Sequence, residues 1–210
     1  MNKIIQFIPR KDLSAQRNLE AFVTLARDHT PTCGDREGFT WDDVRWSTSH
    51  HGIRFTNEEN ARLHPSKTPS PEQLLHPAFM EVAKAYLWHC HHKKPHVDFS
   101  RQMQALRALE YVLRQDMGVP DITKVSQRHF DQAVNVLCRH TSASFLVSGL
   151  LSILKQLADY AIARHYPEIG DGPDRYLEFF RRVRDAQAAL ELLRADVARW
   201  QEQAQGLTSD

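Results

Sequence analysis

The sequence after Pro77 contains five amphipathic segments, and this succession constrains the fold more than any other feature of the chain. In each segment, apolar side chains recur every three or four residues, which places them on one face of an α-helix. The segment from Ser142 to Arg164 is the most apolar, and its wide apolar face, which includes Phe145, suits the centre of a bundle. We therefore predict a mainly α protein built around a bundle of four to five helices.

The C-terminal segment is longer than the others. It follows the helix-breaking run PEIGDGP and keeps its apolar spacing from Asp174 to about Gln205. Six apolar residues are separated by intervals of 4, 7, 3, 4 and 3, close to a heptad repeat: Phe179, Val183, Leu190, Leu193, Val197 and Trp200. The sequence predicts one long helix here, and one hypothesis is that it pairs with a second copy of the chain or with a partner protein.

Before Pro77 the sequence predicts smaller elements. Residues 13–28 form one amphipathic helix with Ser14 as its N-cap. Apolar and polar residues alternate on both sides of a Ser/Thr/His/Gly turn within residues 44–55, which predicts a small β-hairpin. Residues 57–77 hold four prolines and predict a linker. We thus divide the chain into an N-terminal region with helix, hairpin and linker (1–76), a helical domain (77–165) and a long C-terminal helix (166–210).

The charged side chains are unevenly distributed, although the whole chain has 27 Lys and Arg against 26 Asp and Glu. Residues 78–165 carry 11 basic and 7 acidic side chains, whereas residues 166–210 carry 6 and 9. Basic side chains spread over successive helices are typical of phosphate-backbone binding, and a helix N-terminus can hold a phosphate. The candidate DNA-binding residues are Arg101, Lys124, Arg128, Arg139, His140, Ser142, Ser144 and Lys155. The alternative is that these charges only solvate the surface of the helices.

No sequence motif indicates catalysis or a metal. The chain has neither a GxSxG nor a GxxxxGK[ST] motif, which would indicate a nucleophilic serine or a phosphate-binding loop. Four histidines and Cys90 lie between His89 and His96, but their spacing does not bring four zinc ligands together. We therefore predict no catalytic residue, no metal ligand and no cofactor.

The cysteines and the apolar runs indicate the cellular compartment. Three cysteines lie far apart with no CxxC pair, which is typical of a reducing environment. The apolar run at the N-terminus stops at Pro9, and no run approaches the roughly 20 residues that span a membrane. We expect a cytoplasmic protein without a membrane partner.

Three stretches of the helical part resemble a known family: AFMEVAKAYLWH, SRQMQALRALEYVLRQ and DITKVSQRHFDQAVNVLCRHTSASFLVSGLLSILKQLADYA. Together with the opening MNKIIQFIPRKDLSAQRNLEAFVTLARD and the Trp-containing hairpin, they resemble the N-terminal core-binding (SAM-like) region of tyrosine recombinases, the phage-type site-specific integrases. The resemblance covers residues 1–163. It implies a helical module that clamps double-stranded DNA during recombination or integration of a mobile genetic element in a bacterial cytoplasm.

In that family the chemistry belongs to a separate catalytic domain that supplies an Arg, a Lys, a His-x-x-Arg and the nucleophilic Tyr. Only 45 residues follow the helical domain here, and His51-Gly-Ile-Arg54 lies before it, so we treat that match as a coincidence. The resemblance thus implies an integrase-like DNA-binding protein that is not an enzyme. The alternative function is a helical protein-interaction or oligomerisation module that acts through the acidic C-terminal helix.

Overall fold

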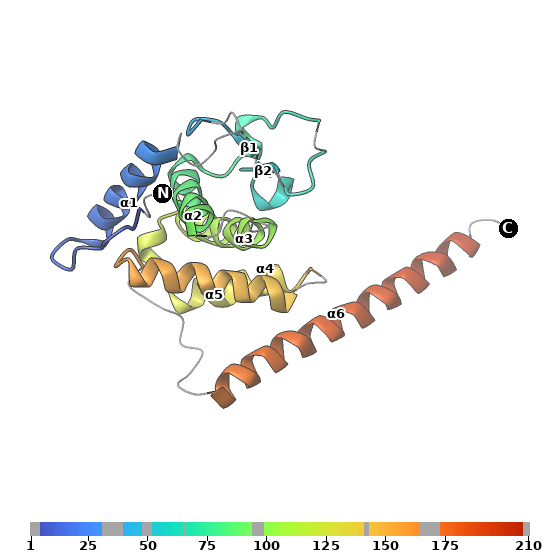
Figure 1. Ribbon diagram of the computed structural model, residues 1–210. Helices are drawn as coiled ribbons and strands as arrows, with labels where there is room; N and C mark the ends of the chain where they lie inside the picture. Colours follow the sequence, from blue (N-terminus) through green and yellow to red (C-terminus); the bar gives the residue numbers. More distant parts are fainter. Residues whose placement is uncertain are drawn as a thin grey trace.

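The computed structural model describes residues 5–30, 40–47, 52–64, 66–93, 99–140, 143–163 and 173–207, with side chains in the last range for 178, 179 and 181–204. Within these residues, six α-helices, two strands and short 3-10 turns follow one another in sequence (Figure 1). The helices are α1 (Ala15–His29), α2 (Pro77–Lys93), α3 (Ser100–Met117), α4 (Gln127–Leu137), α5 (Ala143–Asp159) and α6 (Pro173–Leu207). The strands are β1 (Arg45–Ser47) and β2 (Gly52–Arg54), and the 3-10 turns are η2 (Glu58–Asn60), η3 (Pro71–Gln73) and η4 (Ile122–Lys124). The predicted mainly helical fold with one small hairpin is confirmed.

The hairpin packs as its alternation predicts. β1 and β2 are antiparallel, and Trp46 lies opposite Ile53. Both side chains are buried, and Trp46 meets the ring of Phe55 edge-on at 5.2 Å between ring centres. The chain then continues the pairing through an isolated bridge between Thr56 and Leu74, which fastens the proline-containing segment to the hairpin.

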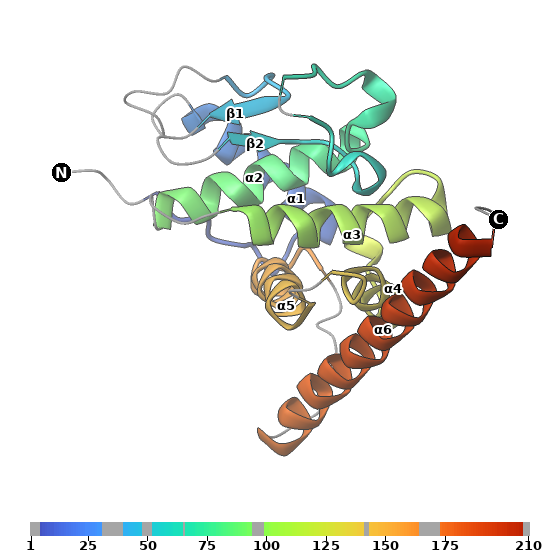
Figure 2. The same ribbon diagram turned by 90° about the vertical axis from the view of Figure 1, so that its right-hand side faces the viewer.

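The helix at the centre of the bundle is α3. It packs against α2, α4, α5 and η2, and it runs beside α2 and crosses above α4 and α5, which Figure 2 shows end-on. Leu106, Leu109 and Leu113 are fully buried along it. The most apolar helix, α5, was expected at the centre, but it packs on one side of α3, and Phe145 in its first turn is 57% exposed.

The helix α5 also ends earlier than its apolar pattern predicts. After Asp159 the backbone adopts a left-handed conformation at Ala161, with a φ of 54°. The amides of Ile162 and Ala163 then both donate to the carbonyl oxygen of Leu157, which closes the helix. Ile162 and Ala163 are buried although they lie outside the helix. Their apolar side chains, which the sequence pattern assigns to the helix, therefore pack in the turn that follows it.

The C-terminal helix α6 touches the bundle mainly through its first turns. Phe179 stacks near Phe130 of α4 with ring centres 5.8 Å apart, and Val183 is buried. Beyond that, α6 runs obliquely past the bundle and extends outward (Figure 1). The predicted single long helix is confirmed, and its later apolar residues are exposed: Leu192, Leu193, Val197 and Trp200.

One hydrophobic core crosses the boundary predicted near residue 76. Phe7, Trp46 and Phe55 from the N-terminal region belong to the same buried cluster as α2, α3, α4 and α5. The division into three regions stays a prediction. Within the described residues, no helix combines the length and the apolar character that crossing a membrane requires.

A histidine is buried in this core. His89 of α2 is 3% exposed, and its Nε2 lies 2.9 Å from the hydroxyl oxygen of Tyr160. The rings of Phe22 and Tyr160 lie against it. Burial lowers the pKa of His89 to about 4, since a charged imidazole would lose its water here, and the cation of Lys93 acts in the same direction.

This histidine predicts a loss of stability in mild acid. Between pH ~6.5 and 4, the unfolded chain takes up a proton on His89 that the folded chain does not, so stability present above ~6.5 is lost as the pH falls. His89→Gln keeps a polar partner for Tyr160 and cannot titrate. We expect its melting temperature to fall less between pH 7 and pH 4.5 than that of the wild type, as measured by circular dichroism. Gln16→Leu, which changes an exposed side chain that cannot titrate, should keep the wild-type slope, and the same slope in His89→Gln would contradict the prediction.

Candidate functional site

A cleft rich in arginine lies where η2, α3, the end of α4 and α6 meet. Its volume is about 410 Å³. We call it the arginine cleft, and its lining residues are Arg62, Arg107, Arg139, Arg194, Glu58, Glu59, Ala61, Gln104 and His140. Four guanidinium groups face two carboxylates, so the cleft carries a surplus of positive charge.

Arg107 has a structural role at the base of this cleft. Its Nε donates to the carbonyl oxygen of Thr56 at 2.8 Å, and its Nη2 donates to the carbonyl oxygen of Arg54 at 2.9 Å and to Oγ1 of Thr56 at 3.1 Å. Burial lowers the pKa of Arg107 to about 10. The group is therefore still charged at neutral pH, although its Nε and Nη2 donors are used by Arg54 and Thr56.

Arg194 and His140 also have partners within the protein. Arg194 donates from Nη2 to the carbonyl oxygen of Arg139, which fastens α6 to the end of α4, and from Nη1 to Glu191 at 2.9 Å. Nε2 of His140 lies 3.4 Å from a carboxylate oxygen of Glu58. These contacts fix the walls of the cleft.

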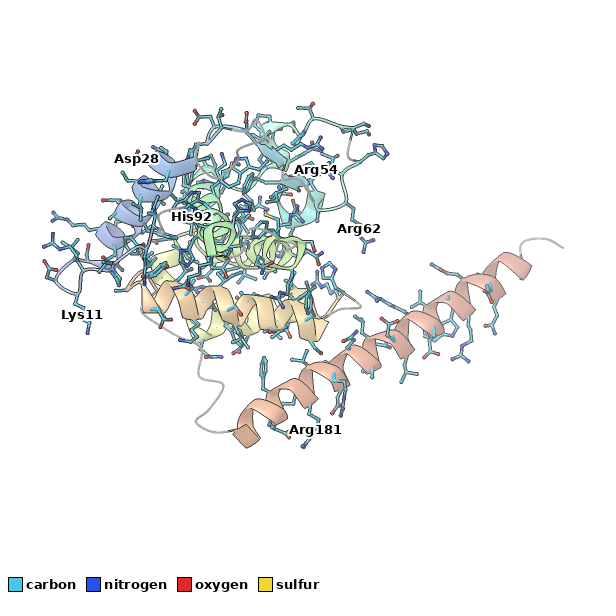
Figure 3. The ribbon with its side chains drawn as sticks, viewed as in Figure 1. Lys11, Asp28, Arg54, Arg62, His92 and Arg181 are labelled. Carbon is cyan, nitrogen blue, oxygen red and sulfur yellow. The ribbon has the colours of Figure 1, made fainter. Side chains whose placement is uncertain are left out.

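The guanidinium groups of Arg62 and Arg139 differ from these. Both residues are exposed, and neither side chain has a hydrogen-bond or ion-pair partner among the residues that the structure describes. Arg62 lies on the side of the body past which the C-terminal half of α6 runs (Figure 3). Their donors are thus available to an anion in the arginine cleft.

A second cavity lies beside the first, between α3 and α4. Its volume is about 310 Å³. We call it the amide groove, and it is lined by Tyr111, Val112, Gln115, Asp116, Arg128, Gln132, Asn135, Val136 and Arg139. Arg139 lines both cavities, so the amide groove and the arginine cleft adjoin at this side chain.

The carboxylate of Asp116 joins the two helices at one end of the amide groove. It lies 3.0 Å from Nε2 of His129 and 3.7 Å from the guanidinium of Arg128. The amide of Ser126 donates to Nδ1 of His129 at 3.1 Å, which assigns the ring hydrogen to Nε2 and makes Asp116 its acceptor. The hydrogen bond from His129 lowers the pKa of Asp116, and Asp116 therefore stays ionised at neutral pH.

Three of the predicted DNA-binding residues lie at these cavities. Arg128 lines the amide groove, His140 lines the arginine cleft, and Arg139 lines both. Lys124 and Lys155 do not, and each pairs with a nearby carboxylate, at 3.0 Å to Asp121 and 3.1 Å to Asp159. The structure thus brings three of the predicted basic residues, Arg128, Arg139 and His140, together at these cavities.

The remaining predicted residues lie at the start of α5 or beside it. The guanidinium of Arg101 lies over the ring of Phe145, 4.3 Å from its centre, and the stem of Arg101 occupies the space that a Cβ on Gly149 would take. Ser144 is half-buried in the first turn of α5. Ser142, His51 and His96 lie outside the described residues. Within the described part of the chain, no three His, Cys, Asp or Glu side chains gather as metal ligands would.

Sequence reasoning missed Arg62 and Arg194, the arginines that complete the cleft. Arg62 lies in the segment interpreted as a linker, and Arg194 lies in the helix interpreted as acidic. The two are 132 positions apart, and no periodic pattern relates them. Only the path of α6 past the end of α4 brings them to one cleft.

The chain is similar in part to curated bacterial proteins named protein nucleotidyltransferase YdiU. The protein from Cereibacter sphaeroides (strain ATCC 17025 / ATH 2.4.3) is 37% identical over 103 residues, which cover 48% of this chain and 19% of that protein. The protein from Ruegeria pomeroyi is 37% identical over 101 residues, 46% of this chain and 18% of that protein. The protein from Rhodococcus jostii is 51% identical over 53 residues, 23% of this chain and 9% of that protein. This chain thus spans about a fifth of the length of the first relatives, and neither a protein-family model nor a solved structure matches it.

These relatives correct the family and the function predicted from the sequence. The similarity is to protein nucleotidyltransferases, so the resemblance to a tyrosine recombinase was wrong, and so were DNA recombination and integration as the function. The prediction of a protein that is not an enzyme is contradicted by the same names, and the alternative of a pure interaction module gains no support. The physical reason is that the recombinase resemblance consisted of amphipathic helix patterns, which any bundle of this kind satisfies.

The three hydrogen bonds of the Arg107 side chain predict how much this residue contributes to the free energy of unfolding. Arg107→Met removes three hydrogen bonds to the backbone and side chain after β2 and leaves their buried acceptors unpaired. We expect a loss of about 3 kcal/mol in the free energy of unfolding, measured by urea denaturation. Arg17→Met, at an exposed position on α1, serves as the control and should change the stability little. Equal stability of Arg107→Met and the wild type would contradict the structural role.

Proposed function

We propose that this chain acts in nucleotidyl transfer and that its arginine cleft binds the phosphates of the nucleoside triphosphate. The observation that carries this proposal is the similarity to protein nucleotidyltransferase YdiU over 103 residues. The chain spans about a fifth of the length of that relative, and we propose the nucleoside triphosphate as the donor and a protein as the acceptor.

The proposed reaction sets the requirements of the site. A hydroxyl oxygen of an acceptor protein bonds to the α-phosphorus of the nucleoside triphosphate, and the bond between the α-phosphorus and the bridging oxygen breaks. Pyrophosphate leaves, and the proton of the hydroxyl passes to water or to a carboxylate. Negative charge grows on the leaving pyrophosphate, so the reaction requires fixed cationic groups around the phosphates.

The arginine cleft offers such groups in two forms. Arg107 is held by carbonyl and hydroxyl oxygens, which are neutral acceptors, so it keeps its full positive charge in a fixed place. Arg194 is also fixed, by the carbonyl oxygen of Arg139, but the carboxylate of Glu191 offsets part of its charge. Arg62 and Arg139 bring donors that the described residues leave unused. Guanidinium groups bind phosphate oxygens in pairs of parallel hydrogen bonds, and this supports the cleft as the phosphate site.

Transfer of label from a nucleotide tests the reaction. We expect the purified chain, incubated with magnesium and ATP labelled at the α-phosphate, to become labelled itself or to label an added protein. ATP labelled at the γ-phosphate serves as the control, since that label leaves with pyrophosphate. Absence of α-label in protein would contradict the proposed transfer, and labelling from the γ-position would indicate a kinase instead.

Binding measurements test the arginine cleft independently of the reaction. The double variant Arg62→Gln/Arg139→Gln removes two cationic donors, so we expect ATP and inorganic tripolyphosphate to bind at least about tenfold more weakly by isothermal titration. The matched control is Arg17→Gln/Arg182→Gln, which removes the same charge outside the cleft and should bind as the wild type does. Equal losses in both double variants would show that net charge alone, and not the cleft, holds the phosphates.

Three sequence-based expectations stay predictions. They are the binding of double-stranded DNA, self-association through the C-terminal helix and a cytoplasmic location. The exposed side chains of Leu193, Val197 and Trp200 are compatible with self-association, which a measurement of mass by light scattering would test.

A further inference from the structure

We infer that the amide groove is the subsite for the nucleobase of the nucleotide whose phosphates lie in the arginine cleft. This inference rests on the proposed function, because it presupposes phosphates in that cleft. Beyond the phosphate site, it assigns a second cavity to the nucleotide, gives the orientation of the nucleotide, and gives a binding role to uncharged residues of α3 and α4.

The amide side chains of the groove are the first observation. Gln115, Gln132 and Asn135 line it, and none of them has a hydrogen-bond partner among the described residues. Some amides elsewhere in the described part of the chain are paired, such as Gln16 with Glu20 at 3.0 Å and Gln127 with Asp131 at 2.8 Å. An amide presents a donor beside an acceptor, which matches the adjacent acceptor and donor on the edge of a base.

The walls of the groove provide the apolar part of such a site. Val112 and Val136 are 5% and 6% exposed and form part of its lining, and Tyr111 adds an aromatic ring. Bases stack on aromatic rings, and small-molecule sites combine apolar walls with a few polar groups. A volume of about 310 Å³ lies at the low end for ligand pockets, which suits a base with its sugar better than a whole nucleoside triphosphate.

The charges at the two ends of the groove determine the orientation. At one end, the ionised carboxylate of Asp116 lies 3.7 Å from the guanidinium of Arg128, so the two charges offset each other and leave no surplus of positive charge for phosphates. Arg139 stands at the other end, where the groove adjoins the arginine cleft. The base therefore lies toward Asp116, and the phosphates lie past Arg139.

Two ligands separate the base subsite from the phosphate site. ATP carries a base, whereas inorganic tripolyphosphate presents only the phosphate chain. Gln132→Leu and Asn135→Leu, made singly, each remove one amide from an accessible position on α4, so both proteins should fold, which circular dichroism melting checks. We expect each variant to bind ATP about tenfold more weakly and to bind tripolyphosphate unchanged, by isothermal titration with the full chain. Gln16→Leu makes the same chemical change on α1 and should affect neither ligand.

The outcomes distinguish the failure of this inference from that of the proposed function. Unchanged ATP affinity in both amide variants would overturn the base subsite while the arginine cleft still stands. An equal loss for ATP and tripolyphosphate would also overturn it, since the amides would then act on the phosphates. If the wild type binds ATP no more tightly than tripolyphosphate, no base subsite exists. Selective loss of ATP binding without any transfer of α-label would support the subsite and contradict the proposed reaction.

Discussion

The guanidinium of Arg107 holds the hairpin region against the helical bundle. Its side chain extends from α3, the helix that packs against α2, α4 and α5, and its nitrogens donate to Arg54 at the end of β2 and to Thr56. Carbonyl groups that leave a strand and become buried require donors, and one guanidinium supplies several in a fixed plane. The segment with η2 and Arg62 is thereby placed beside the end of α4, and the arginine cleft depends on that placement as well as on the path of α6.

The arginines of the cleft contribute differently to anion binding: some provide charge alone, and others also provide unused hydrogen-bond donors. Carbonyl acceptors occupy the donors of Arg107 but leave its charge intact, since burial lowers its pKa only to about 10. Glu58 and Glu59 offset part of the positive field, and His140 stands next to Glu58. The net positive electrostatic field can thus concentrate anions in the cleft, and the unused donors of Arg62 and Arg139 can form hydrogen bonds to them.

Sequence periodicity predicted the local structure well, because burial of one face of a helix or strand leaves a regular pattern. Trp46 and Ile53 alternate with polar neighbours and pair in the hairpin, and the apolar spacing after residue 173 gives one long helix. Periodicity did not show that Phe145 would be exposed, since its ring covers Arg101 instead of the core. It also could not show the cleft, because its arginines come from distant segments. They meet through tertiary contacts, such as the hydrogen bond from the side chain of Arg194 to the backbone carbonyl of Arg139.

The same bond couples the cleft to the position of α6. Phe179 and Val183 attach the helix to the bundle near its start, and the hydrogen bond of Arg194 fixes α6 at the cleft itself. An anion that bridges Arg194 and Arg139 would bind the docked arrangement of α6 more tightly than an undocked one. By thermodynamic reciprocity, whatever holds α6 in place then strengthens binding in the cleft by the same factor. The exposed apolar residues further along α6 are therefore linked to the cleft through a single helix, although they lie outside it.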